Sequence, residues 1–403
     1  MLSFYVKDLD AKLYQIPYRV LKYPIIIESL HNLFQVVFDA SIIPSVWRKA
    51  IMCPILKYYS TDPRVPMNYR GVRLLSCISK LYIAFINKRC FCYLEDSNLL
   101  ADEQNRFRRN RSCEDHVFTL NSLIRNNDSL FVAFIDLKKC FDFIDRHMML
   151  YTLLLNNIDG KIYNSISSIY QNSEFCVPLN GKLTDWFICE PGVKQGDNLY
   201  PTLFAVFIND LVKEVNDQDM GINIVDKKLL ILVYADDIAM VANNEEDLQH
   251  LLNKLHCWWK KWRVLINTDK SNCMHFRRGR SKQIEFEFTV GRNVCEIVEQ
   301  YTYLGVTFNC KGNFTPNANT LGKAAGRTLG KIISKIHILK DFGFKSYEAL
   351  YFSCFYIGLF VGCVGLQKIT SFRQYSKQSN EILSRCAPFC PASRNIWRYG
   401  MDS

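Results

Sequence analysis

The most informative stretch of the sequence is LLILVYADDIAMVA, residues 229–242. Two adjacent carboxylates, Asp236 and Asp237, interrupt a run that is otherwise almost wholly apolar. Because an ionised carboxylate is costly to bury, the pair needs a cation or hydrogen-bond donors beside it. The run is also too short and too rich in branched residues for one good helix. It therefore predicts two buried strands that meet at Ala235 and Asp236.

Helical patterns lie on both sides of this run. Apolar residues at spacings of three and four predict helices over residues 23–47, 79–94 and 245–265, and another that begins near Pro201. Pro44 is expected to end the first of these helices. Either Asn243 or Asn244 is the expected N-cap of residues 245–265.

Strand-like patterns alternate with these helices. Apolar, β-prone residues predict strands over residues 50–56 and 131–137. Residues 58–73 are rich in Pro, Asn and Arg and predict a loop. The alternation of strands and helices indicates an α/β or an α+β chain.

A third acid, Asp136, ends the predicted strand over residues 131–137. If that strand neighbours the one that carries Asp236 and Asp237, three carboxylates converge. Hard oxygen ligands favour Mg²⁺ or Mn²⁺. Such a site can hold two divalent ions about 3.5 to 4 Å apart, an arrangement that serves phosphoryl transfer. The alternative is that each acid caps a turn or lies at a solvated strand end.

The charge balance of the 403 residues favours a polyanionic partner. Lysines and arginines number 50 against 39 acids, a formal charge of +11, and clusters such as residues 106–111 concentrate the excess. Binding to phosphates would release counterions, although a simply basic surface is the alternative. Hydrophobic residues at 49% and charged residues at 22% exclude a disordered or fibrous class.

The 16 cysteines are scattered without regular spacing, and residues 1–16 do not resemble a signal peptide. This pattern indicates a reducing compartment rather than a disulfide framework. The close pairs, Cys90 with Cys92 and Cys386 with Cys390, lack the histidines of a zinc site. Residues 352–366 are apolar but too few to cross a bilayer, so a buried helix is expected there.

The tetrapeptide YADD (residues 234–237) resembles the YxDD motif of reverse transcriptases, and other segments follow in that family's order. These segments are FIDLKKCFD (134–142), GVKQGDNLYPTLF (192–204), NTDK (267–270) and YLG (303–305). Upstream segments resemble the finger motifs of the non-LTR (LINE-type, jockey-like) retrotransposon branch. They are IPSVW (43–47), PILK (54–57), NYR (68–70), LL (74–75) and QNRFRRNRS (104–112).

The resemblance, which covers residues 43–304, implies an α+β fold of the right-hand polymerase type. Fingers, a palm made of an antiparallel sheet packed on helices, and a helical thumb are expected. The implied boundaries are an N-terminal helical extension at residues 1–49, fingers at 50–130, palm with finger insertions at 131–300, and primer grip with thumb or C-terminal tail at 301–403. The implied activity is that of an RNA-directed DNA polymerase.

Matched position by position, the resemblance implies that Asp136, Asp236 and Asp237 hold two Mg²⁺ or Mn²⁺ ions for nucleotidyl transfer. The incoming nucleotide is expected to meet Lys57, Arg70, Phe141, Gln195, Gly196 and Lys270. Phe141 would be the aromatic gate against the ribose 2′-hydroxyl. The expected primer grip is Tyr303, Leu304 and Gly305, and the expected nucleic-acid contacts are Arg108 and Arg111. A duplex-gripping thumb helix is expected around Lys323, Arg327, Lys331 and Lys335.

Each of these roles has a structural alternative: Phe141 as a core residue, the glycine loop as a plain turn, and the basic residues as solvated surface. The chain also departs from the family pattern. It has Arg106 and Cys140 where the family has glycine and alanine, and Gly71 and Tyr200 where it has proline and serine. These departures suggest a drifting copy, so the alternative function is a decayed or domesticated, non-catalytic RNA-binding protein.

The expected partners are an RNA template, a DNA primer or target, and dNTPs, with no membrane. Full elements of this branch carry an endonuclease domain, which is expected in the full element but absent from these residues. An intracellular location is expected, in the nucleus if synthesis is primed at a DNA target.

Overall fold

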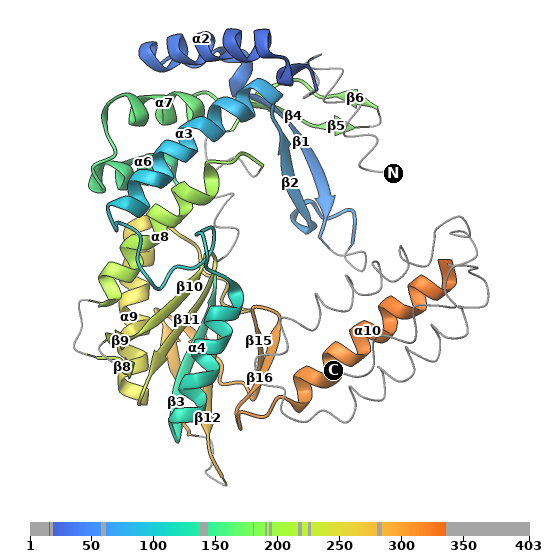
Figure 1. Cartoon of the computed structure of the whole chain (residues 1–403). Helices are drawn as coiled ribbons and strands as arrows, with labels where there is room; N and C mark the ends of the chain where they lie inside the picture. Colours follow the sequence, from blue (N-terminus) through green and yellow to red (C-terminus); the bar gives the residue numbers. More distant parts are fainter. Residues whose placement is uncertain are drawn as a thin grey trace, which may run out of the picture.

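The computed structural model describes residues 16, 19–57, 62–137, 144–179, 181–189, 192, 196–216, 220–224, 227–279 and 284–335. Within these residues helices and mainly antiparallel strands alternate along the chain, so the fold class is α+β as predicted (Figure 1). The helix expected over residues 352–366 lies outside the described residues.

The longer helices cover the sheets. They are α2 (Pro24–Ala40), α3 (Cys77–Asp96), α4 (Cys113–Asn126), α6 (Arg146–Leu155), α7 (Gly160–Tyr170), α8 (Tyr200–Asn216), α9 (Glu245–Trp262) and α10 (Thr315–Lys335). Short 3₁₀ turns lie at Val20–Lys22, Ser45–Arg48 and Pro66–Asn68. In none of the helices among the described residues is there a stretch long and apolar enough to cross a membrane.

The strands form two four-stranded sheets and several small hairpins. They are β1 (Lys49–Leu56), β2 (Tyr69–Leu74), β3 (Ser129–Asp136), β4 (Glu174–Cys176), β5 (Pro178–Leu179), β6 (Lys182–Leu183), β7 (Phe187–Ile188), β8 (Ile222–Ile224), β9 (Lys227–Leu229), β10 (Ile231–Tyr234), β11 (Asp237–Ala242), β12 (Asn272–Arg277), β13 (Phe288–Val290), β14 (Asn293–Cys295), β15 (Gln300–Tyr303) and β16 (Val306–Asn309).

Most predicted elements are confirmed. The helices over residues 79–94 and 245–265 and the one near Pro201 correspond to α3, α9 and α8, and Asn244 caps α9 by accepting the backbone N–H of Asp247. The run at residues 229–242 forms the β10–β11 hairpin, and the strands over residues 50–56 and 131–137 correspond to β1 and β3.

Two element predictions were wrong at their ends. The helix predicted over residues 23–47 ends at Ala40, because Ser41 adopts the left-handed conformation (φ 54°) before Pro44 is reached. Residues 58–73 were predicted as a loop, but their last part is β2, which pairs antiparallel with β1 from Leu56↔Tyr69 to Ile51↔Leu74. Turn-forming residues dominate the local composition there, whereas pairing with β1 decides the structure.

The central sheet has the order β10-β11-β3-β12 and is antiparallel throughout. Successive side chains of β3 point to opposite faces of the sheet, so they pack into two different hydrophobic cores. Phe131, Ala133 and Ile135 join the core that includes α8 and α9, whereas Val132 and Phe134 join the core that includes α4 and β15–β16. In Figure 1 α4 and α9 lie on opposite faces of the sheet.

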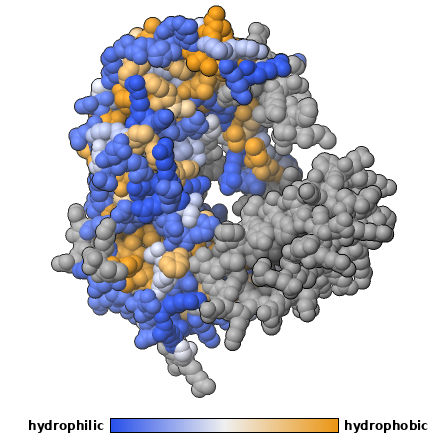
Figure 2. Space-filling model, in the orientation of Figure 1, coloured by the Kyte–Doolittle hydropathy of each residue, from blue (hydrophilic) through white to orange (hydrophobic). Residues whose placement is uncertain are grey.

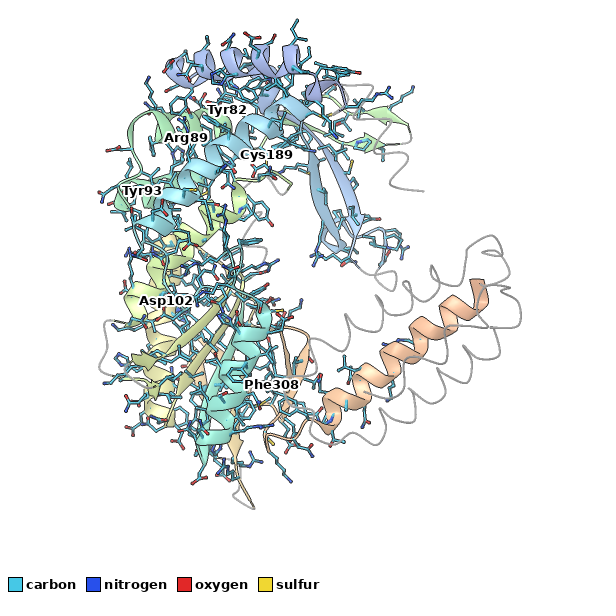
Figure 3. All side chains as sticks on the ribbon, viewed as in Figure 1. Tyr82, Arg89, Tyr93, Asp102, Cys189 and Phe308 are labelled. Atoms are coloured by element: carbon cyan, nitrogen blue, oxygen red, sulfur yellow. The ribbon has the colours of Figure 1, made fainter. Side chains whose placement is uncertain are left out.

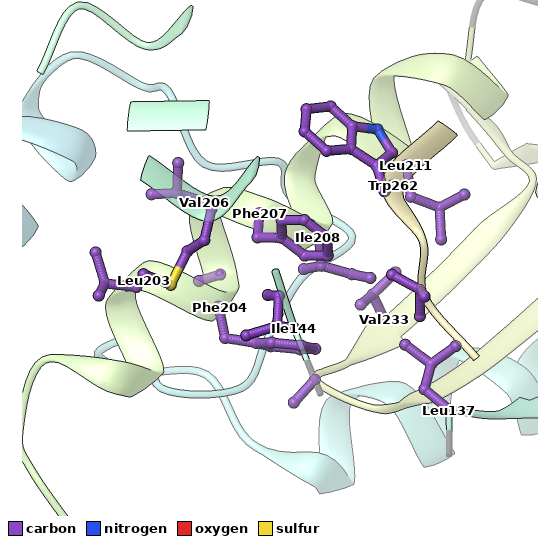
Figure 4. Close-up of a cluster of buried hydrophobic side chains, with 14 of the residues drawn as sticks. Leu137, Ile144, Leu203, Phe204, Val206, Phe207, Ile208, Leu211, Val233 and Trp262 are labelled. Atoms are coloured by element: carbon purple, nitrogen blue, oxygen red, sulfur yellow. The ribbon is translucent and has the colours of Figure 1, made fainter. Parts of the chain in front are cut away.

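The core behind the end of β3 is apolar and continuous. Leu137, Val233 and Trp262 lie in one cluster with the buried face of α8 (Figure 4). The carboxylate of Asp210 on α8 accepts hydrogen bonds from the indole N–H groups of Trp258 (3.2 Å) and Trp262 (2.7 Å) on α9. These bonds hold the two helices in one register beneath the sheet.

The second sheet has the order β2-β1-β4-β7 and lies beside α2, α3 and α7 (Figure 1). Tyr82 on α3, which Figure 3 labels, packs against Phe34 and Trp47 with ring centroids 5.4 and 5.5 Å apart. Hydrophobic residues also reach the surface around α2, among them the exposed Tyr23 and Ile25 (Figure 2). The β1–β2 ribbon projects from this layer toward the central sheet.

Candidate active site

The central sheet brings the three predicted acids together. Asp136 is the last residue of β3 and Asp237 the first of β11, and the two are direct partners in the antiparallel register. Asp236 precedes Asp237 in the turn from β10. Side chains at paired positions of neighbouring strands have Cβ atoms about 4.5 to 5.5 Å apart. One end of the sheet therefore concentrates three carboxylates.

The turn before Asp237 has an unusual backbone. Ala235 adopts a left-handed conformation (φ 57°) and is fully buried, which is uncommon for a residue with a Cβ. With Asp236 it forms a two-residue loop between the paired Tyr234 and Asp237. The side-chain oxygen of Gln104 accepts the N–H of Ala235 at 3.3 Å and so holds the loop.

Burial and mutual repulsion act on these acids. Burial, with the charges of Asp236 and Asp136 second and third, raises the pKa of Asp237 to about 6. Burial is also the main cause that raises the pKa of Asp236, with the charge of Asp136 adding to it. The site holds more negative charge than its environment readily accepts, which is a condition that a bound cation relieves.

Basic residues compensate part of this charge. Arg106 lowers the pKa of both Asp236 and Asp237, and its Nη1 lies 3.2 Å from Oδ1 of Asp236. Arg70 acts on Asp236 and Lys270 on Asp237 in the same direction. The predicted nucleotide-binding residues Arg70 and Lys270 therefore lie within electrostatic reach of the acids.

An asparagine missed as a site residue fixes Asp136. The side-chain amide of Asn267 donates to Oδ2 of Asp136 at 2.7 Å, and its backbone N–H donates to the Asp136 carbonyl at 2.8 Å. Ser271 accepts the backbone N–H of Asp136 at 3.1 Å. Asn267 is the first residue of the NTDK segment, which could be recognised in the sequence. Its hydrogen bond to Asp136 could not be recognised there.

The carboxylates fit hard divalent cations in donor type and charge. Among the described residues, no group of three or more His, Cys, Asp or Glu side chains is close enough to hold a metal as arranged. Asn267 binds Oδ2 of Asp136, and Arg106 binds Oδ1 of Asp236. A metal ion that used these two oxygens as ligands would have to replace the Asn267 and Arg106 contacts.

The β1–β2 ribbon carries two predicted nucleotide-binding residues. Lys57 follows β1, and its backbone N–H donates to the carbonyl of Asn68 at 2.9 Å. Arg70 lies on β2 opposite Ile55 and is exposed. Arg70 thus lies on the β1–β2 ribbon, and Lys57 directly follows the first strand of that ribbon.

Gly196 has a clear reason to be glycine. Its φ is +116°, and a Cβ at this position would lie 2.6 Å from the carbonyl oxygen of Arg73 at the end of β2. The backbone before α8 therefore touches β2 directly. Phe141 and Gln195, the other residues expected in this region, lie outside the described residues.

The predicted primer grip forms the turn of the β15–β16 hairpin. Leu304 (φ 48°) and Gly305 (φ 82°) are both left-handed, as a tight two-residue hairpin requires. Tyr303 is buried, and its hydroxyl lies 3.5 Å from Nδ1 of His116. Gly305 in the turn is exposed to solvent, whereas the Tyr303 ring is buried.

Tyr301 is a further site residue that sequence reasoning missed. Its ring stacks on Phe134 with centroids 4.3 Å apart, and its hydroxyl donates to the Lys270 carbonyl at 3.3 Å. Burial and then the charges of Asp136 and Asp237 raise the pKa of the Tyr301 hydroxyl. The hairpin is thereby attached to the acid-bearing end of β3.

Two arginines expected to contact nucleic acid bind protein groups. Arg108 pairs with both carboxylate oxygens of Glu95 (2.9 and 2.8 Å) and donates to the Ala101 carbonyl at 2.8 Å, so it anchors its own loop. Arg111 pairs at 3.0 Å with Asp102, which Figure 3 labels on the segment between α3 and α4. Their contact with nucleic acid stays a prediction.

The remaining basic residues of the expected thumb lie on α10. Lys323 and Arg327 are exposed there, and nothing is described of the Lys331 and Lys335 side chains.

The sequence profile described as reverse transcriptase (RNA-dependent DNA polymerase) matches residues 60–308, more than half of the chain. The chain belongs to the reverse transcriptase family. The matched segment contains all three acids of the candidate site and the Arg70, Gly196 and Lys270 positions.

Curated relatives of this reverse transcriptase come from mobile elements. It is 23% identical over 86% of its length to a probable RNA-directed DNA polymerase from transposon BS of Drosophila melanogaster. It is 25% identical over 74% to the RNA-directed DNA polymerase from mobile element jockey of the same species. It is also 25% identical over 66% to the Pol polyprotein from the type-1 retrotransposable element R2 of Nasonia vitripennis. The resemblance to the non-LTR branch is confirmed.

The chain spans only 38%, 33% and 28% of these three relatives. Among solved structures, telomerase from Candida tropicalis with a fragment of telomeric RNA is 14% identical and has a TM-score of 0.48. The match covers 88% of this chain and 58% of that one.

Proposed function

We propose that this reverse transcriptase chain is an active RNA-directed DNA polymerase that extends a DNA primer 3′-end on an RNA template. The single observation that carries the proposal is the register pairing of Asp136 with Asp237, beside Asp236. Three carboxylates at the ends of rigid, buried strands are what two-metal nucleotidyl transfer requires.

Two Mg²⁺ or Mn²⁺ ions held by these acids would activate the primer 3′-hydroxyl and neutralise charge on the triphosphate. The chain's own residues supply the rest. Asn267 orients the Asp136 carboxylate. Arg70 and Lys270, with Lys57, are suited to bind triphosphate oxygens, and Arg is well shaped for this. Phe141, Gln195 and Gly196 complete the proposed nucleotide pocket.

The proposed partners follow from this activity. An RNA template, a DNA primer or target and dNTPs would bind along the basic surfaces of the β1–β2 ribbon and α10. An endonuclease domain elsewhere in the full element and a nuclear location are part of the same proposal, since synthesis would begin at a DNA target.

The test is primer extension by the purified chain on a primed homopolymer RNA with dNTPs and Mg²⁺. The Asp236→Asn, Asp237→Asn double variant is expected to lose at least about 1000-fold in rate, because the metal charge stabilisation is gone. Asp128→Asn, an exposed acid just before β3 and at the opposite end of that strand, is the matched control and should retain activity. Equal incorporation by the wild type and the double variant would refute the proposal, as would no incorporation by either.

A further inference from the structure

A positively charged side chain, that of Arg106, lies at the candidate metal site. Arg106 places its Nη1 3.2 Å from Oδ1 of Asp236, and both side chains are about one-third exposed (33% and 30%). The guanidinium thus places a permanent positive charge beside one of the three acids.

The loop that carries Arg106 is attached firmly to the sheet and helices. Residue 104 forms a parallel bridge with Val233 of β10, where the N–H of Val233 donates to the Glu103 carbonyl at 2.9 Å. On α8, the Asn209 side chain accepts the N–H of Ala101 at 2.6 Å and donates to the Leu99 carbonyl at 2.7 Å. The backbone at Arg106 thus has a set position beside the acids.

The side chain itself has defined surroundings. The guanidinium lies over the rings of Phe107 and Tyr234, 4.9 and 5.4 Å from their centroids. The N–H of Arg106 donates to Gln104, the residue that also binds the turn at Ala235. Gln104 therefore links the arginine to the turn that carries Asp236.

We propose that the Arg106 guanidinium is a resident counter-cation that competes with divalent metal for Asp236. Arginine stays protonated in proteins, so Arg106 cannot make room for a metal ion by losing its charge. A metal that takes Oδ1 of Asp236 must displace the guanidinium, and a metal that binds beside it must accept a positive charge nearby. Either effect weakens metal binding. The inference deepens the proposed function, because it concerns the same carboxylates.

The test measures Mn²⁺ binding to the full chain by electron paramagnetic resonance, without nucleotide or nucleic acid. Arg106→Gln and Arg106→Gly are expected to lower the Kd for Mn²⁺ about twofold to fivefold, the range for a partly exposed ion pair. Arg109→Gln is the matched control, since Arg109 is an exposed arginine of the same loop. It should leave the Kd unchanged.

A second background makes the test specific. In the Asp236→Asn chain, adding Arg106→Gln should change the Kd for Mn²⁺ less than twofold, because the competing pair no longer exists. An unchanged or raised Kd in Arg106→Gln would overturn the proposal, as would the absence of Mn²⁺ binding in every variant. Thermal unfolding of each variant shows whether the loop still folds.

Primer extension separates this inference from the proposed function. If Arg106→Gln tightens Mn²⁺ binding but no variant extends a primer, the counter-cation role stands and the polymerase proposal fails. If the wild type extends primers but Arg106→Gln has the same Kd for Mn²⁺ as the wild type, the polymerase proposal stands and the counter-cation proposal fails. A higher KM for dNTP with unchanged Mn²⁺ affinity would assign Arg106 to the nucleotide and overturn the proposal.

Discussion

For a single residue, the conflict between folding and function is clear at Asp237. Burial and two neighbouring acids raise its pKa to about 6. A buried, charged carboxylate destabilises the fold at neutral pH, and a residue kept despite that cost is typical of a functional site. Its register partner Asp136 is held in place by Asn267, so the strain is not relieved by turning the side chains apart.

This conflict predicts how stability depends on pH. In the unfolded chain Asp237 ionises near pH 4, whereas in the native chain it retains its proton up to about pH 6. Between these values the native state binds more protons, so the contribution of Asp237 to stability falls as pH rises. Asp237→Asn should therefore stabilise the metal-free chain by about 1 to 2 kcal/mol at pH 7.5 relative to pH 4, after allowance for solvent screening.

Urea unfolding at both pH values, in a chelating buffer, measures this difference. Asp128→Asn is the control, because Asp128 is exposed just before the other end of β3. An equal effect of Asp237→Asn at pH 4 and pH 7.5 would contradict the prediction.

At the scale of the element, the backbone just before α8 is in direct contact with the end of β2. This contact links α8, which packs beneath the central sheet, to the second sheet. Gly196 has φ +116° and touches the Arg73 carbonyl where any Cβ would clash. Asp197, the next residue, caps α8 by accepting the N–H groups of Leu199 and Tyr200. The glycine therefore sets how closely α8 approaches the β1–β2 ribbon.

Gly196→Ala should lower the free energy of unfolding by about 2 to 4 kcal/mol, because it combines a forbidden backbone angle with a clash against a main-chain oxygen. Gly160→Ala is the matched control. Gly160 also has a positive φ (+56°), but nothing lies within 4 Å of its added Cβ. It should cost only about 1 kcal/mol.

Urea unfolding of both glycine variants measures the loss of stability in each. A larger loss in Gly196→Ala than in Gly160→Ala would show that the close contact with Arg73 adds to the backbone strain. Equal losses would mean that the Arg73 carbonyl moves away without cost.

At the scale of the whole molecule, the net charge of +11 predicts salt-dependent binding of a polyanion. Each phosphate neutralised releases condensed counterions, so affinity falls steeply as salt rises. Part of the basic excess is already used inside the protein, since Arg108 binds Glu95 and Arg106 binds Asp236. Exposed basic residues such as Arg70 on β2 and Lys323 and Arg327 on α10 are candidates for binding phosphates.

Affinity for a primed RNA–DNA duplex should fall at least about tenfold between 50 and 200 mM salt, the effect expected for a few phosphate contacts. Fluorescence anisotropy without divalent metal measures it. The Asp236→Asn, Asp237→Asn chain should bind at least as tightly as wild type, since it carries two fewer negative charges. Salt-independent affinity would argue against a phosphate-binding surface.

Features that depend on a local pattern could be predicted from the order of the amino acids alone. The YADD turn between two buried strands, the helices α3, α8 and α9, and the Asn244 cap all follow from residue spacing and residue type within one segment. The order of motifs also identified the family and named the three acids. Periodicity shows which face of an element is buried, so such predictions need no knowledge of distant residues.

Contacts between residues that are distant in the chain became visible in the folded protein. The pairing of Asp136 with Asp237, the bond from Asn267, and the Arg106–Asp236 ion pair join residues far apart in the chain. The strand β2 was missed for the same reason, because its partner β1 rather than its own composition makes it a strand. Register and ion pairing are properties of two segments at once, and a pattern read along one segment does not contain them.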